Sequence, residues 1–133
     1  MDDCIFCKII KGEIPSYKIY EDEKTYAFLD IACDATGHTL VIPKKHCTNV
    51  LDCDEEYLAA TMATVQRIAK HYVEDCGYDG VNIINASGKA AQQSVFHLHF
   101  HIIPRKNGDG MDLFPLKDKL DIDMAEVQKR LAL

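Results

Sequence analysis

The chain has 133 residues, of which 47% are hydrophobic and 27% charged, enough to bury the core of one soluble domain. A formal net charge of −6 argues against non-specific binding to nucleic acid or to an anionic membrane. No apolar run is long enough for a transmembrane helix, and the acidic N-terminus does not resemble a signal peptide. We therefore expect a single cytoplasmic domain over residues 1–133, with reduced cysteines.

The first predicted elements are a short N-terminal helix or turn and a β-hairpin. Gly12 stops the helical segment. Strands over residues 17–20 and 25–29 flank a polar turn, and a third strand is expected over residues 38–43. This third strand ends at Pro43, because proline has no amide hydrogen to donate to a sheet.

One long amphipathic helix is predicted from Asp54 to Asp75, because apolar side chains recur there every three or four positions. Strands over residues 80–85 and 95–103 follow, with a polar loop between them and Pro104 ending the second. A last short helix covers residues 124–131. Five short strands around one long helix predict an α+β domain.

Three histidines alternate with apolar residues in the last predicted strand. His97, His99 and His101 therefore share one face, and the apolar residues between them share the other. The first and third imidazoles lie about 13–14 Å apart along a strand, so they do not easily bind one metal ion. The pattern favours one histidine for chemistry and neighbours that position a substrate or serve another site. The alternative is a half-exposed strand that uses histidine as its polar residue.

Cys4 and Cys7 form a C-x-x-C pair, which indicates half of a zinc site, a redox pair or two buried cysteines. No strand precedes the motif, which disfavours a thioredoxin-like arrangement. A zinc site needs two further ligands, and His46 and His97 are the candidates. Four protein ligands would make such a site closed and structural.

Two further groups of residues suit a nucleotide. Asn85 and the loop that reaches Ser94 precede the histidines, where amide and hydroxyl groups can donate hydrogen bonds to phosphate oxygens. Asp30 follows the second strand and can accept the hydroxyls of a ribose. Neighbouring apolar residues can enclose a base: Phe28, Leu29 and Ile31. An ordinary solvated loop and a turn-forming aspartate are the alternatives.

These segments, in this order, resemble the histidine triad (HIT) superfamily of nucleotide hydrolases and transferases, and the small bacterial HIT proteins in particular. The run from His97 to Ile103 matches the family signature His-φ-His-φ-His-φ-φ, where φ is apolar. Further matching segments are residues 4–10, 28–31, 37–46 and 93–95. The resemblance covers about residues 4–105 and leaves 106–133 as a C-terminal extension. It implies a five-stranded antiparallel sheet, a short N-terminal helix, and a homodimer whose sheets join into one of ten strands.

The resemblance also implies a covalent mechanism. His99 would attack the α-phosphorus of a purine nucleotide, and water would then hydrolyse the nucleotidyl-histidine. The other ring nitrogen of His99 would donate to the backbone carbonyl of His97. His101 would bind phosphate oxygens, and His38 would lie beside the triad, with no metal in the chemical step. The remaining implied contacts are to phosphate from Asn85, Gln93 and Ser94, to ribose from Asp30, and to the base from Phe28, Leu29 and Ile31.

In several bacterial members of the family, zinc is bound by residues that match Cys4, Cys7, His46 and His97, which implies a structural zinc here. The leaving group is open: residues 104–106 resemble dinucleoside polyphosphate hydrolases, whereas residues 93–94 resemble nucleoside phosphoramidases. One alternative function is a nucleotide-binding regulatory module with little turnover. A zinc-dependent structural or interaction protein is another.

Overall fold

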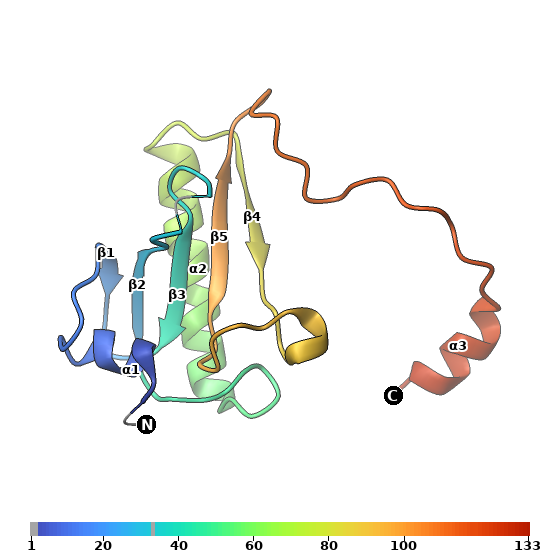
Figure 1. Cartoon of the computed structure of the whole chain (residues 1–133), viewed down its shortest axis with the longest axis horizontal. Coiled ribbons are helices and arrows are strands. Elements are labelled where there is room, and N and C mark those ends of the chain that lie inside the picture. The colour runs from blue at the N-terminus through green and yellow to red at the C-terminus, as the bar shows by residue number, and fades with distance from the viewer. Residues whose placement is uncertain (1–2, 33) are drawn as a thin grey trace.

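The structure is a computed structural model that describes residues 3–32 and 34–133. One antiparallel sheet lies between a long helix on one face and a short N-terminal helix on the other (Figure 1). A 3-10 turn at Lys89–Ala91 lies in the loop before the last strand. The elements are α1 (Ile5–Ile10), β1 (Lys18–Glu21), β2 (Thr25–Leu29), β3 (Thr39–Pro43), α2 (Glu55–Glu74), β4 (Gly80–Ile84), β5 (Phe100–Arg105) and α3 (Met124–Leu131).

The sheet has the strand order β1-β2-β3-β5-β4, and every neighbouring pair is antiparallel. This order confirms the predicted five-stranded α+β fold. β5 lies between β3 and β4, so the last strand of the sheet in sequence is interior in space. Its residue His101 pairs with Leu40 of β3 on one side and with Ile84 of β4 on the other.

The alternation around the histidines separates two faces, as predicted. Leu98, Phe100 and Ile102 are buried in the core beneath α2, where they meet Val65 and Ile68. Replacing one of these large core side chains with alanine would cost about 2–5 kcal/mol of stability. The three imidazoles lie on the other side, where the ring of Phe6 in α1 contacts those of His97 and His99. The apolar face therefore anchors the segment that carries the imidazoles.

The predicted strand over residues 95–103 is wrong in its bounds. Regular pairing begins at Phe100 and continues past Pro104 to Arg105. Pairing with β3 begins at Val41 opposite Phe100, and Pro43, two residues further along β3, has no N–H to continue the ladder. Its carbonyl instead faces the ring of His97, whose Nε2 lies 2.9 Å away. Pro104 is tolerated because β5 at that point pairs only with β4.

The helices follow the sequence prediction to within one residue. Gly77 has φ +82° just after α2, the left-handed conformation expected of a helix stop. Asp123 caps α3, because its side chain accepts a hydrogen bond from the Glu126 amide. In Figure 1 the segment after β5 leaves the sheet and carries α3 away from it. Within the part of the chain that is described, no helix is both long enough and apolar enough to span a bilayer.

Candidate functional site

A pocket of about 390 Å³ opens between α1, the end of β2 and the segment that leads into β5. Its wall is mainly apolar, and its polar groups include Asp30, Ser94, His99 and His101. A pocket of this size with a few convergent polar groups is typical of a small-molecule site. The lining also includes the three residues predicted to surround a base, namely Phe28, Leu29 and Ile31.

His99 has one ring nitrogen fixed by the backbone. Its Nδ1 donates to the carbonyl oxygen of His97 over 2.8 Å, which leaves Nε2 with an unprotonated lone pair. Only 5% of His99 is exposed, and burial lowers the pKa of its imidazole, so the ring is neutral near pH 7. The side-chain amide of Asn85 donates to the carbonyl of His99 over 3.0 Å. His99 therefore offers a neutral ring nitrogen that can act as a nucleophile. The carbonyl of His97 holds its ring, and the side chain of Asn85 holds its backbone carbonyl.

His101 and His38 form a second pair of imidazoles beside His99. Nε2 of His38 lies 2.8 Å from Nδ1 of His101, and the ring centroids of His99 and His101 lie 4.9 Å apart. Burial, and then the neighbouring imidazoles, lower the pKa of His101 to about 4. On the other side, Nδ1 of His38 lies 2.6 Å from the carboxylate of Asp34.

Asp34 was not among the residues predicted to belong to the site. Its position four residues before His38, in the loop between β2 and β3, is the only signal in the sequence. Nothing in that spacing distinguishes it from an ordinary loop carboxylate until the loop is folded.

Asp30 lies at the end of β2, where its backbone amide donates to the carbonyl of His38 over 2.8 Å. Oδ1 of Asp30 accepts from the Ala32 amide, and Oδ2 lies 3.7 Å from Nδ1 of His38. The carboxylate therefore borders both the apolar part of the pocket (the apolar slot lined by Phe28, Leu29 and Ile31) and the pair of imidazoles, His38 and His101. A ribose that follows a base into the slot would meet this carboxylate.

Asn85 and Gln93 lie beside the pocket rather than in its lining. Gln93 is buried, and its amide nitrogen donates to the carbonyls of Thr48 and Val95. Its side-chain oxygen accepts hydrogen bonds from the side-chain amide of Asn49 and from the backbone amide of Gly88. Both amides therefore hold the loop and backbone around the pocket, and their direct contact with phosphate stays a prediction. Of the three residues predicted for phosphate alongside His101, Ser94 is the one in the lining.

A second cluster contains the four predicted zinc ligands. Zinc–sulfur and zinc–nitrogen bonds of about 2.3 and 2.0–2.1 Å place tetrahedral ligand atoms about 3.3–3.6 Å apart. The ligand atoms lie at or close to this spacing. The Sγ–Nδ1 distances are 3.4 Å for Cys4–His97, 3.4 Å for Cys7–His46 and 3.5 Å for Cys7–His97, and the Nδ1–Nδ1 distance for His46–His97 is slightly shorter at 3.2 Å.

The surroundings of this cluster also suit zinc. Nε2 of His97 donates to the Pro43 carbonyl over 2.9 Å, which turns a bare Nδ1 toward the sulfur atoms. The Cys7 amide donates to Sγ of Cys4 over 3.4 Å, which orients this sulfur at the start of α1. His97 therefore joins two sites, since its ring faces the metal ligands and its carbonyl holds the ring of His99.

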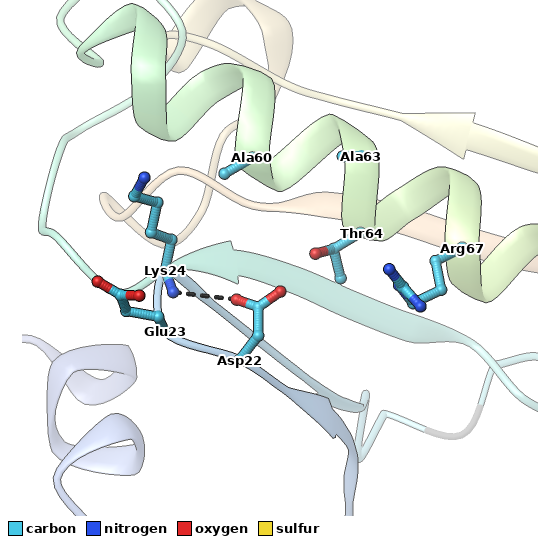
Figure 2. Close-up of a pocket in the computed structure, with 7 residues that line it drawn as sticks. All are labelled: Asp22, Glu23, Lys24, Ala60, Ala63, Thr64 and Arg67. Carbon is cyan, nitrogen blue, oxygen red and sulfur yellow. Dashed lines mark hydrogen bonds between the residues drawn. The ribbon is translucent and has the colours of Figure 1, made fainter.

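A separate hollow of about 290 Å³ lies between the β1–β2 turn and α2. Figure 2 shows its side chains, among them Asp22, Lys24 and Arg67. The carboxylate of Asp22 accepts from the amides of Lys24 and Thr25, so it closes the turn. None of the lining residues is a histidine or cysteine. This hollow therefore offers no imidazole or thiol that could act as a nucleophile or bind zinc.

Comparison with known proteins places the chain in a family. The model of the HIT domain matches residues 11–108. An uncharacterized HIT-like protein of Borreliella burgdorferi is 44% identical over 97% of this chain and 94% of its own length. An adenosine 5′-monophosphoramidase of Saccharomyces cerevisiae is 46% identical over 78% of this chain and 63% of its own. An adenylylsulfatase of Arabidopsis thaliana is 42% identical over 81% of this chain and 55% of its own length.

One similar solved structure is described as zinc-bound. A zinc-bound histidine triad family protein of Mycobacterium smegmatis superimposes with a TM-score of 0.80 at 44% identity, covering 88% of this chain and 85% of that one. The fold, the imidazole cluster and the sequence match agree, and the chain therefore belongs to the histidine triad (HIT) family.

Proposed function

We propose that the chain is a HIT-type hydrolase in which Nε2 of His99 attacks the α-phosphorus of a purine nucleotide conjugate. The bond between phosphorus and the leaving group breaks, and a nucleotidyl-histidine forms. Water then cleaves the phosphorus–nitrogen bond and frees the nucleotide and His99. The observation that carries this proposal is the hydrogen bond from Nδ1 of His99 to the His97 carbonyl, since it leaves the opposite nitrogen unprotonated beside the pocket.

Hydrogen-bond donors of the protein would stabilise the phosphoryl charge. His101 and the hydroxyl of Ser94 border the pocket near His99 and can donate to phosphate oxygens. Zinc, when bound, supplies structural cross-linking: Cys4 and Cys7 at the start of α1 would be tied to His46 and His97. The reacting phosphate would lie in a different site from these four ligands. Thiolate ligands require reduced cysteines, which suits a cytoplasmic protein.

We favour a small leaving group such as the amine of a phosphoramidate, in line with the activity named for the yeast relative. The test is turnover by the wild-type protein of an adenosine phosphoramidate and of a diadenosine polyphosphate, followed by chromatography of released AMP. Faster release from the phosphoramidate supports the proposal. Binding of AMP without turnover of either compound would instead support a regulatory nucleotide-binding module.

Asp30→Asn tests the proposed ribose contact. Hydrogen bonds to a charged acceptor contribute about 1.5–3 kcal/mol, so we expect AMP to bind at least about tenfold more weakly. The same variant should bind 2′,3′-dideoxy-AMP as tightly as the wild type does, because that ligand has no hydroxyls to donate. Isothermal titration calorimetry with both ligands on both proteins measures the coupling. An equal loss for the two ligands would mean that Asp30 does not contact the ribose.

We also propose a homodimer in which β4 of one copy pairs with β4 of a second, so that two sheets form one of ten strands. Of the two edge strands, β1 has a register irregularity and carries Lys18 and Glu21, features that protect an edge from pairing. β4 has the uncharged sequence GVNII, and Ile83 is 45% exposed. The β4 edge is therefore the one that can pair without burying a charge.

Ile83→Lys is expected to convert the dimer into monomers, because a charge would be buried where the two edges meet. Ile19→Lys is the matched control, since Ile19 is a similarly exposed isoleucine on the opposite edge strand. Light scattering on the eluting protein should give twice the chain mass for the wild type and the control, and the single mass for Ile83→Lys. A wild-type protein that elutes with the mass of one chain would contradict the dimer.

A further inference from the structure

Three side chains form a continuous hydrogen-bonded row that ends at the pocket. The carboxylate of Asp34 lies 2.6 Å from Nδ1 of His38, and Nε2 of His38 lies 2.8 Å from Nδ1 of His101. His38 is 6% exposed, whereas Asp34 is 58% exposed. A surface carboxylate is thus linked through one buried ring to the imidazole that borders His99.

The geometry restricts where protons can reside. A carboxylate only accepts, so the short contact with Asp34 requires a proton on Nδ1 of His38. The contact between His38 and His101 requires a proton on one of the two facing nitrogens and a lone pair on the other. If the facing proton belongs to His38, that ring is cationic and neutral His101 carries its proton on Nε2. If the pair has lost this proton, His101 donates to His38 and its Nε2 is bare.

We propose that Asp34 is a positioning residue that fixes the tautomer of His38 and retains one extra proton on the His38–His101 pair. His101 then presents an Nε2–H group to the bound phosphate or to the leaving group. This inference rests on the proposed function, and it assigns a role to a residue that does not line the pocket.

The surroundings favour this distribution of charge. Burial, and then the neighbouring His99 and His38, lower the pKa of His101 to about 4, so the ring of His101 is the less favourable place for the positive charge. Two carboxylates face His38: Asp34 at 2.6 Å and Asp30 at 3.7 Å. The shorter distance makes Asp34 the stronger partner of a cationic ring.

The proton balance of both steps follows. When His99 attacks, the leaving amine departs with the electron pair of the phosphorus–nitrogen bond and takes the proton from Nε2 of His101. The facing proton of His38 then moves to Nδ1 of His101, and the Asp34 carboxylate stays ionised throughout. In the second step, the bare Nε2 of His101 accepts a proton from the attacking water, and the proton on Nδ1 of His101 returns to Nε2 of His38, which restores the starting state.

Asp34→Asn tests the inference in the free protein. The asparagine oxygen can accept the same hydrogen bond from His38 but carries no charge. Long-range ¹⁵N spectra of the histidine rings should show that His38 keeps its Nδ1–H, while the midpoint at which the pair loses its extra proton falls by about one pH unit or more. This readout does not depend on activity, so it tests the inference even if the protein hydrolyses no nucleotide.

The pH dependence of kcat/KM is the second readout. Loss of the extra proton removes the donor, so activity should fall on the alkaline side, and Asp34→Asn should move this limb to lower pH by the same amount. Asp34→Glu should return it toward the wild-type position. Asp75→Asn is the matched control, because Asp75 also lies four residues from a histidine and 2.8 Å from its Nδ1, on the exposed surface of α2. Unchanged midpoints in both the spectra and the rate profile of Asp34→Asn would overturn the inference.

Discussion

His99→Ala is expected to lower turnover of a nucleotide substrate by at least about 10⁴-fold, because it removes the group that forms the covalent bond. The site around it should persist, since the apolar slot and Asp30 come from other elements. AMP binding should therefore change by less than about tenfold, a range that corresponds to about 1.4 kcal/mol. Single-turnover kinetics measure the first effect, and calorimetry with AMP measures the second.

His71→Ala is a suitable control for this experiment. His71 lies on the exposed side of α2, away from the pocket, and should be dispensable for turnover. If His99→Ala kept a tenth or more of the wild-type rate, His99 would not be the nucleophile. Equal losses of AMP binding and turnover would indicate that the substitution had damaged the whole site.

Cys7→Ala is expected to abolish stoichiometric zinc binding and to destabilise the fold. A ligand that binds only the native state at about 1,000 times its Kd stabilises it by about 4 kcal/mol. Loss of zinc at such a concentration should lower the melting temperature by about 10 °C or more. Metal analysis of the purified protein and thermal unfolding with and without added zinc check both effects.

Cys76→Ala separates loss of a ligand from loss of any thiol. Cys76 is exposed after α2 and is not part of the four-ligand cluster, so this variant should bind one zinc per chain and melt like the wild type. The zinc assignment fails if the wild type contains no metal and a chelator does not change its unfolding. It also fails if Cys7→Ala still binds one zinc per chain.

Much of the fold was predictable because the spacing of apolar residues indicates which side chains face the core. The alternation around His97, His99 and His101 identified a buried apolar face, which the structure confirms. The 3.6-residue pattern of α2 identified its buried centre at Val65, Ile68 and Tyr72, whereas Met62 of the same pattern is exposed. The zinc cluster could be proposed because two cysteines and two histidines occur at positions typical of the family. Its distances come from the way α1 packs against the segments that carry His46 and His97.

The remaining features depend on tertiary contacts that periodicity does not contain. The start of β5 is set by the missing amide of Pro43 on the neighbouring strand, which no pattern within residues 95–103 reveals. The side-chain amide of Gln93 is hydrogen-bonded to the carbonyl of Thr48 and to the side chain of Asn49, because its loop folds back on these two residues. Asp34 joins the imidazoles only through the conformation of the β2–β3 loop.

The most direct test of the mechanism is to isolate the covalent intermediate. Wild-type protein mixed with an adenosine phosphoramidate and quenched within one turnover should gain the mass of one adenylyl group. Peptide mapping under alkaline conditions, which preserve a phosphorus–nitrogen bond, should locate that mass on His99, and Asp34→Asn should form the same adduct. Steady turnover without an adduct under any quench time, or an adduct on His97 or His101, would contradict the account.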